Sequence, residues 1–175
     1  MAREEFRKKR DREKDVVDDG IKTKLVTTRR VSKVVKGGRN SSFAALVVAG
    51  DGKVRVGIGM GKATEVPEAI KKAEQAARRD MKKIALNGTA IPHETIGEFS
   101  CSKVLLRPAP EGKGVIAGGS VRAVLELCGI NNITTKCYGS RNPINVVKAT
   151  MRALESLRTL DQVAAIRGKT VDEIL

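Results

Sequence analysis

Tryptophan is absent from this 175-residue sequence, which holds only three phenylalanines and one tyrosine. Proteins that bind single-stranded nucleic acid usually stack bases on aromatic side chains, and four aromatic residues cannot build such a platform. Histidine is also scarce. His93 stands alone beside Pro92, so a histidine-based metal site or a Ser/His/Asp triad would rest on one side chain. We therefore predict no catalytic residue, no metal site and no cofactor.

Cysteines are few, and no long apolar run is present. The three cysteines are an odd number without CxxC spacing, which excludes a disulfide framework and a metal knuckle and favours a reduced, cytosolic protein. We expect all three (Cys101, Cys128 and Cys137) to be small core residues. No apolar run approaches the ~20 residues that a membrane helix needs. The charged N-terminus lacks the apolar stretch of a secretory signal.

Positive charge is what the chain has in excess. Lys and Arg number 34 against 20 Asp and Glu, a formal net charge of +14. Residues 1–20 hold equal numbers of both signs and few apolar side chains, so we expect a disordered tail. Residues 21–50 hold seven basic side chains and no acidic one. A field this local indicates a polyanionic partner, the alternative being a merely solvated surface.

The first half of the chain predicts three strands and a helix, with the sheet carrying the helix on one face. Residues 22–36, 43–50 and 53–60 have strand patterns, and residues 67–79 form a helical pattern with Pro67 in its first turn. Between them, residues 37–40 suggest a loop and Asp51-Gly52 a two-residue hairpin turn. Gly57 and Gly59 alternate onto the same face as Arg55. We expect them to let a bulky partner approach the sheet.

The second half predicts a further α+β unit. We expect one long strand over 95–107, a glycine- and proline-rich loop over 108–119 and a helix over 120–128 capped by Ser120. A strand over 131–138 and a helix capped by Asn142 follow. Thr170 and Glu173 have capping-box spacing, which indicates a terminal helical turn. The α+β chain thus divides into a tail (1–20), a βββα unit (21–84), a second α+β domain (85–160) and a C-terminal tail (161–175).

Two glycine clusters raise the alternative of phosphate chemistry. Residues 57–64 fail the spacing of a P-loop and of GxGxxG. Residues 112–120 open a helix, whose bare amides could hold a nucleotide phosphate, contact an RNA backbone or form a tight loop. A phosphotransferase using this loop is the main rival function. Binding to an anionic membrane is the other, although the helix over 67–79 offers mostly alanine on its apolar side.

Structured RNA is the polyanion that the basic strand-and-loop surface fits best. Such RNA is recognised through phosphates and shape, which requires cations on a shaped surface rather than aromatic side chains. Glycines in the loop would allow a close approach of the backbone. The predicted RNA-binding residues are Arg29, Arg30, Lys33, Lys36, Gly37, Gly38, Arg39, Asn40, Arg55 and Lys62.

Several long segments resemble the bacterial small-subunit ribosomal protein family "S five". They are residues 30–39, 43–48, 50–52 and 56–63 in the first half, and residues 108–119 and 138–147 in the second. The similarity runs from Val26 to Leu175, in order and without large gaps. Val54 departs from it, because the family commonly carries glycine in this hairpin.

The resemblance implies a double-stranded-RNA-binding-like N-terminal domain and a C-terminal domain of the family's own domain-2-like fold. It implies a cytoplasmic, ribosome-bound, non-enzymatic protein that binds small-subunit (16S) rRNA, contributes to subunit assembly and lies near the mRNA entry channel. It further implies an influence on translational accuracy and contacts with ribosomal proteins four and eight. Residues 32–40 match the family's RNA-inserting loop, close to the spectinomycin site. Residues 114–122, including Gly114 and Arg122, match its contact with protein four.

Overall fold

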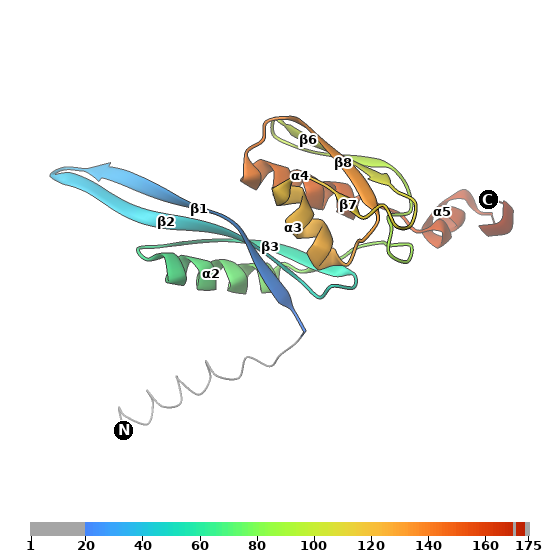
Figure 1. The fold of residues 1–175 in the computed structure, drawn as a ribbon, viewed down its shortest axis with the longest axis horizontal. Helices are drawn as coiled ribbons and strands as arrows, with labels where there is room; N and C mark the ends of the chain where they lie inside the picture. The colour runs from blue at the N-terminus through green and yellow to red at the C-terminus, as the bar shows by residue number, and fades with distance from the viewer. Residues whose placement is uncertain (1–19, 170, 174–175) are drawn as a thin grey trace, which may run out of the picture.

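The computed structural model describes residues 20–169 and 171–173. Two four-stranded sheets follow one another along the chain, in the strand orders β1-β2-β3-β4 and β5-β6-β8-β7 (Figure 1). Helices pack on both sheets, so the predicted α+β class is confirmed. The predicted disordered tail, apart from Gly20, and the capping residue Thr170 lie outside the described residues.

The first sheet is built from three long antiparallel strands and a short fourth one. They are β1 (Lys22–Val35), β2 (Gly38–Gly50), β3 (Arg55–Ala63) and β4 (Lys82–Lys83), with helix α2 (Val66–Arg79) after β3. This is the predicted βββα order. The hairpin turn between β1 and β2 is tighter than the loop predicted over 37–40, because Gly37 takes a φ of 95° and β2 already begins at Gly38.

The connection between β2 and β3 is longer than the predicted two-residue turn. The Asp51 carboxylate accepts hydrogen bonds from the backbone amides of Lys53, Val54 and Arg55, at 2.9, 3.0 and 2.9 Å. These bonds hold residues 51–54 as a compact loop, and β3 starts only at Arg55.

Strand β2 is buried on both faces from residue 45 to residue 50. Ala45 and Val47 pack in a small core with α2, whereas Leu46 and Val48 belong to the larger core shared with the second half. Helix α2 presents a stripe of alanines to the sheet, in agreement with the mostly alanine apolar side predicted for it: Ala69, Ala73 and Ala77.

The glycines of β3 leave room for helix α2 and not for an external partner. Cβ atoms placed on Gly57, Gly59 or Gly61 would each collide with the backbone of α2. The prediction that Gly57 and Gly59 leave room for a bulky partner is therefore wrong. The close approach is made by the chain's own helix, because glycine against alanine lets a helix lie directly on a strand.

The second sheet contains β5 (Thr95–Phe99), β6 (Ser102–Pro108), β7 (Val115–Ile116) and β8 (Ile133–Gly139). Helices α3 (Gly119–Cys128) and α4 (Pro143–Glu155) complete this half. The single long strand predicted over 95–107 is wrong: the chain reverses at Ser100 and Cys101, and Ser100 takes a φ of 53°. This turn lacks the glycine, asparagine or proline that would have signalled it.

Both predicted helix caps differ in detail. Helix α3 starts at Gly119. Its N-cap residue is Gly118, which lies two positions before Ser120, the predicted N-cap. Asn142 is the N-cap of α4 by position, but its side chain does not bond to the helix. Its Oδ1 atom is buried without a partner among the described residues.

The cysteines do not all lie in the core. Cys128 is fully buried and Cys137 is half-buried, but Cys101 is exposed because it sits in the turn that the sequence did not reveal. Within the described residues no disulfide links them.

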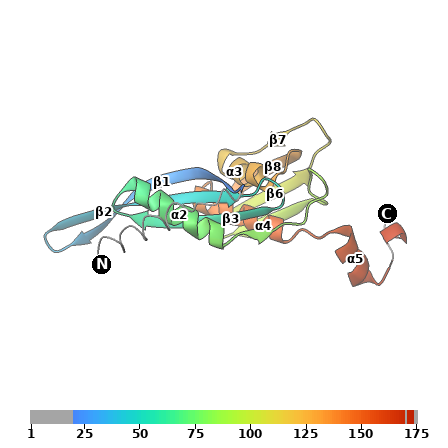
Figure 2. The ribbon, with the colours of Figure 1, turned by 90° about the horizontal axis from the view of Figure 1, so that it is seen from below.

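Helix α3 joins the two halves. It packs on β1, β2 and β3 across the first sheet from α2, and also against α4 and β7 (Figure 2). Lys24 forms an ion pair with Glu126 at 2.7 Å, and Lys82 forms one with Glu155 at 2.9 Å. The Gly52 amide donates to the Leu127 carbonyl at 2.9 Å. One apolar core runs through both sheets as a result.

A final helix that the sequence did not predict, α5 (Leu160–Arg167), follows α4. Thr159 and Gln162 form its capping box, and Gly168 ends it in the left-handed conformation. In Figure 1 it extends from the side of the body opposite the β1–β2 turn. A short 3-10 turn, η1 (Val171–Glu173), comes after it.

Candidate nucleic-acid interface

The site is a two-stranded projection that we call the arm, defined as residues 31–42. Strand β3 stops pairing with β2 at Ala63, opposite Phe43, so β1 and β2 continue alone from Val31 and Ser42 to their turn. Phe43 still packs beside the small core under α2. Beyond it no third strand or helix covers the arm within the described residues, and Figure 1 shows it extending from the body.

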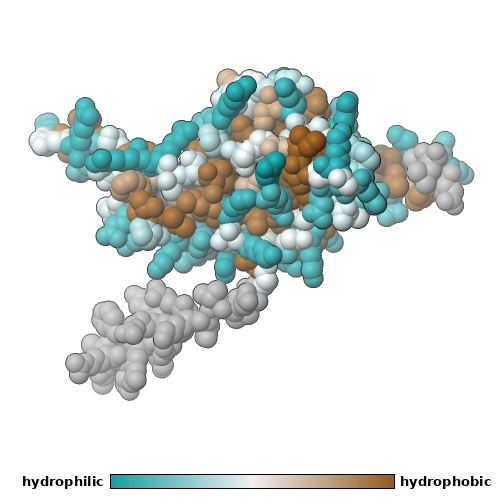
Figure 3. All heavy atoms as spheres, viewed as in Figure 1, coloured by the Kyte–Doolittle hydropathy of each residue, from teal (hydrophilic) through white to brown (hydrophobic). Residues whose placement is uncertain are grey.

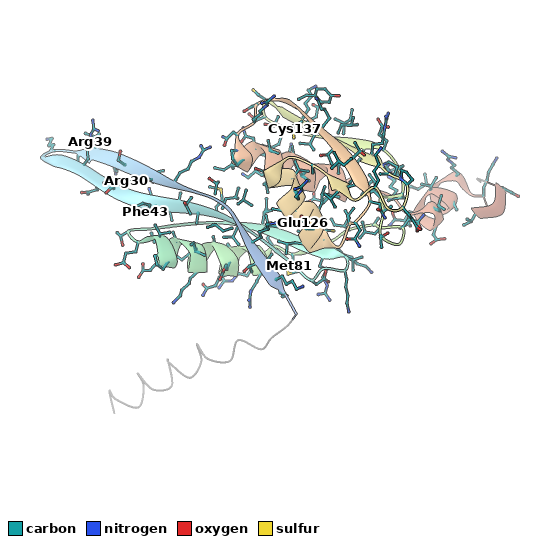
Figure 4. All side chains as sticks on the ribbon, in the orientation of Figure 1. Arg30, Arg39, Phe43, Met81, Glu126 and Cys137 are labelled. Carbon is teal, nitrogen blue, oxygen red and sulfur yellow. The ribbon has the colours of Figure 1, made fainter. Side chains whose placement is uncertain are left out.

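Nine of the ten predicted RNA-binding residues lie on the arm or at its base. Lys33, Lys36, Arg39 and Asn40 are on the arm with Gly37 and Gly38, and Arg29, Arg30 and Lys62 are at its base. All nine are exposed. Figure 3 shows mostly hydrophilic side chains along the arm, and Figure 4 shows Arg39 near its tip.

The cations of this surface are not neutralised by the rest of the described chain. None of them has a carboxylate within ion-pair distance among residues 20–169 and 171–173. Arg30 makes one neutral contact, from Nη2 to the Ser41 hydroxyl oxygen at 3.2 Å. Exposed cations without internal partners retain their full charge for an external anion.

Pairing of the strands brings Lys62 to this surface. Arg29 and Lys62 each lie opposite Ala44, from β1 and β3 respectively, so the two cations share one face of the sheet. Arg29 and Lys62 are far apart in the sequence. Their association is a property of the strand register.

The structure does not bring Arg55 to the arm. It begins β3, at the end far from Ala63, and lies on the same face of the strand as the glycines that face α2. Its Nε lies 3.7 Å from Asp51 Oδ2, so it faces the residue 51–54 loop. The alternation that placed Arg55 and the glycines on one face is correct, but that face belongs to the helix.

Two valines on the arm are also exposed. Val34 is 70% exposed and Val35 is 38% exposed. In the sequence they were ordinary strand residues, and only the absence of a covering element makes them unusual.

The other predicted contact, at Gly114 and Arg122, lies around the loop that precedes α3. Gly114 takes a φ of 75°, and its amide lies 3.4 Å from Asn132 Oδ1, to which it donates. Arg122 donates from Nη2 to the Val115 carbonyl at 3.2 Å. Gly114 thus lies in the loop, and Arg122, from the first turn of α3, is tied to the end of that loop at Val115; both are separate from the arm.

The glycine-rich loop also borders a cavity of about 420 Å³. Gly118, Gly119 and Ser120 line it from α3, and Lys136 and Arg141 are among the residues opposite. No carboxylate lines it, so a phosphotransferase would have no general base there. No cluster of three or more metal-ligating side chains occurs in the described part of the chain. None of the described helices is long and apolar enough to cross a membrane.

Comparison with known proteins identifies the class. The model of "Ribosomal protein S5, N-terminal domain" matches residues 21–85, and that of "Ribosomal protein S5, C-terminal domain" matches residues 97–167. A "Small ribosomal subunit protein uS5" from Alcanivorax borkumensis is 57% identical over 158 residues, covering 90% of this chain and 95% of the relative.

Two further relatives carry the same name. The one from a Psychrobacter species is 57% identical over 158 residues, covering 90% of this chain and 96% of its own. The one from Syntrophobacter fumaroxidans is 56% identical over 151 residues, covering 86% and 91%. The chain belongs to the ribosomal protein S5 family. It is accordingly a structural, non-enzymatic protein of the small ribosomal subunit, bound to the ribosome in the cytoplasm.

Proposed function

We propose that the chain binds small-subunit (16S) rRNA through the arm and its base. The observation that carries this proposal is the arm itself: an uncovered two-stranded projection whose cations have no internal ion pairs in the described chain. Cations at Arg30, Lys33, Lys36 and Arg39 suit phosphate oxygens, with arginine able to bind them in a bidentate manner. Folded rRNA is the polyanion with which a small-subunit protein is assembled.

Recognition of phosphate and shape is favoured over recognition of unstacked bases. Phe43 adjoins the arm at its base, and it packs beside the small core under α2. Phe99 is contacted by Lys148 and Arg152, whose charged groups lie 4.8 and 4.7 Å from the ring centre. Neither ring is available on the arm as a stacking platform, so the phosphate backbone is the expected ligand.

The finer roles follow from the resemblance to the family. We infer contact of the Gly114–Arg122 region with ribosomal protein four, contact with protein eight, and a position near the mRNA entry channel. We also infer contributions to subunit assembly and to translational accuracy. The exposure of Gly112, Lys113 and Arg122 supports a contact surface at that loop.

Salt dependence of rRNA binding tests the proposal. Each phosphate contact releases counterions, so a double variant Lys36→Ala/Arg39→Ala should bind more weakly and lower the slope of log affinity against log salt by about two. The matched control is Arg167→Ala/Lys169→Ala. It removes the same charge from exposed residues at and just beyond the end of α5, away from the arm.

The control pair should leave the slope nearly unchanged. If the arm variant retained the wild-type slope, or if both variants lowered it equally, the arm would not be the phosphate-binding surface. Sedimentation with small subunits at moderate salt would show whether a variant that binds rRNA more weakly in solution is also present at a lower level in the assembled subunit.

A further inference from the structure

Three polar side chains are buried among the described residues: Ser102, Asn132 and Thr150. Ser102 and Thr150 each donate to a single backbone carbonyl. Asn132 alone bonds to two separate segments, at Thr89 and at Gly114. It stands just before β8, with 9% of its surface exposed. A buried amide is retained in a fold where both of its ends have partners, so the question is what this side chain holds in place.

The amide of Asn132 has one orientation that satisfies both neighbours. A backbone N–H can only donate, so the Gly114 amide, 3.4 Å away, requires the Oδ1 atom. The Nδ2 atom then faces Thr89 and donates to its hydroxyl oxygen at 3.3 Å. The Asn132 side chain therefore links a segment that precedes β5 to the loop that precedes β7 and α3.

Backbone groups on both sides of Asn132 reinforce this link. The Asn131 amide donates to the Thr89 carbonyl at 3.0 Å, and the Ile133 amide donates to the Gly114 carbonyl at 3.2 Å. Thr89 itself belongs to a tight turn over residues 87–90, which two backbone hydrogen bonds of 3.0 and 3.1 Å close. The turn is thus the fixed side of the network, and Gly114 is anchored to it through β8.

The loop over residues 109–114 has little structure of its own. Four of its six residues are exposed. Apart from the bonds of Gly114, its one hydrogen bond within the described chain joins two of its own backbone groups, at 3.4 Å. Both ends of the loop meet Ile133, because Pro108 pairs with that residue on one side and Gly114 bonds to it on the other. An exposed segment without packing keeps one conformation only where its ends are fixed.

We propose that Asn132 is the positioning residue of the loop over 109–114 and thereby specifies the contact with ribosomal protein four. This rests on the contact inferred above for the Gly114–Arg122 region, and it adds the residue that presents that region. Asn132 is buried, so it acts through the loop and not by touching the partner. It holds Gly114, whose φ is 75°, at a fixed distance from the turn that contains Thr89.

Two substitutions separate the hydrogen bonds of Asn132 from its volume. Asn132→Leu has a similar size but no polar atom, so the Gly114 amide and the Thr89 hydroxyl lose their partner. Asn132→Asp keeps an acceptor for the Gly114 amide, and the Thr89 hydroxyl can turn and donate to the second carboxylate oxygen. Thr150→Val is the matched control. It removes the hydrogen bond of another buried polar side chain, which runs to the Val146 carbonyl inside α4.

Amide hydrogen exchange of the full-length variants tests the positioning. The Ile133 amide is the reporter, because its acceptor is the Gly114 carbonyl and not the substituted side chain. Its rate is taken relative to slow amides of β2, which removes changes in global stability. In Asn132→Leu this ratio should rise about tenfold, since a buried amide left without an acceptor favours displacement of the loop. Asn132→Asp and Thr150→Val should keep the wild-type ratio. An unchanged ratio in Asn132→Leu, or an equal rise in all three variants, would overturn the proposal.

A binding measurement tests the consequence for the partner. The affinity of each protein is measured for 16S rRNA alone and for 16S rRNA that already carries protein four, and the ratio of the two is the gain due to protein four. Asn132→Leu should bind rRNA alone as wild type does, because the arm is untouched, and should lose most of the gain. Asn132→Asp and Thr150→Val should keep it.

The possible failures are distinguishable. If Asn132→Leu kept the full gain, the role of Asn132 in the contact would be overturned while the contact itself stood. If wild type showed no gain, the inferred contact with protein four would be refuted together with the part of the proposal that concerns the partner. The exchange ratio would still decide whether Asn132 holds the loop.

Discussion

Gly59 lies so close to Ala73 that a Cβ atom on the glycine would stand 2.1 Å from the alanine's carbonyl oxygen. Contacts of this kind, repeated at Gly57 and Gly61, hold α2 directly on β3. The sheet from which the arm extends is therefore fixed by close backbone packing. Its stability depends on positions that carry no charge and touch no RNA in our proposal.

Replacing Gly59 with alanine should destabilise the fold. The obstacle is helix backbone, which cannot rotate away, so overpacking is expected to cost about 1–3 kcal/mol. Gly119→Ala is the control, because a Cβ atom there meets nothing within 4 Å. Urea unfolding followed by circular dichroism measures both, and equal midpoints for the two variants would contradict the close packing.

Asp51 should make stability depend on acid pH. Burial raises the pKa of its carboxyl, but hydrogen bonds from the amides of Arg55, Lys53 and Val54 and the charge of Arg55 outweigh burial and lower it below 3.8. A lowered folded-state pKa contributes stability above the unfolded pKa, and this contribution is lost as pH falls through the folded value.

Two substitutions separate the charge of Asp51 from its hydrogen bonds. Asp51→Ala leaves three amides without their acceptor and should cost about 1–3 kcal/mol at pH 7. Asp51→Asn keeps an acceptor oxygen and removes the titration, so its difference from wild type should shrink as pH falls below 4. Urea midpoints at pH 7 and pH 3 check this, and a constant difference would count against it.

Cys128 should make the fold sensitive to alkali. Burial raises the pKa of its thiol to about 12, with a smaller contribution from the negative charge of Asp51. Well below pH 9 the thiol is protonated in both the folded and the unfolded state. As pH rises from 9 to 12 the unfolded chain alone ionises, which lowers stability by about 4 kcal/mol at most.

Comparison with Cys128→Ala isolates this effect from other alkaline titrations. The free energy of unfolding of wild type should fall more steeply than that of the variant between pH 9 and 12. A thiol reagent at pH 8 should label exposed Cys101 rapidly and Cys128 only on unfolding. Parallel pH profiles for the two proteins, or rapid labelling of Cys128 in the folded protein, would show that the thiol is not buried as described.

Local patterns predicted the elements that have strong local causes. A composition rich in valine and threonine predicted β1, and alternation predicted β3. Helical spacing with Pro67 and Pro143 in first turns predicted α2 and α4. The reversal at Ser100 and Cys101 was missed because a single serine is a weak turn signal and no glycine, asparagine or proline accompanies it. The strand break is set by β6 pairing with β8 and by Gly97 packing under Ala149 of α4.

The candidate site was only partly visible in the sequence. A run of cations without acids between residues 21 and 50 identified the arm's chemistry. Arg55 and Lys62 were both expected to extend the patch across the sheet. The register separates them: Lys62 lies across Ala44 from Arg29, and Arg55 faces the loop held by Asp51.

By itself the sequence determined the segregation of positive charge, the order of the βββα half and the membership of the ribosomal protein S5 family, because these depend on residue types and local spacing. Tertiary structure alone decided which face each cation occupies, that the β3 glycines are filled by α2, and that the arm has two uncovered faces. Those properties depend on which strands pair with one another and on where β3 ends. Local sequence patterns do not specify them, because they involve residues that are far apart in the chain.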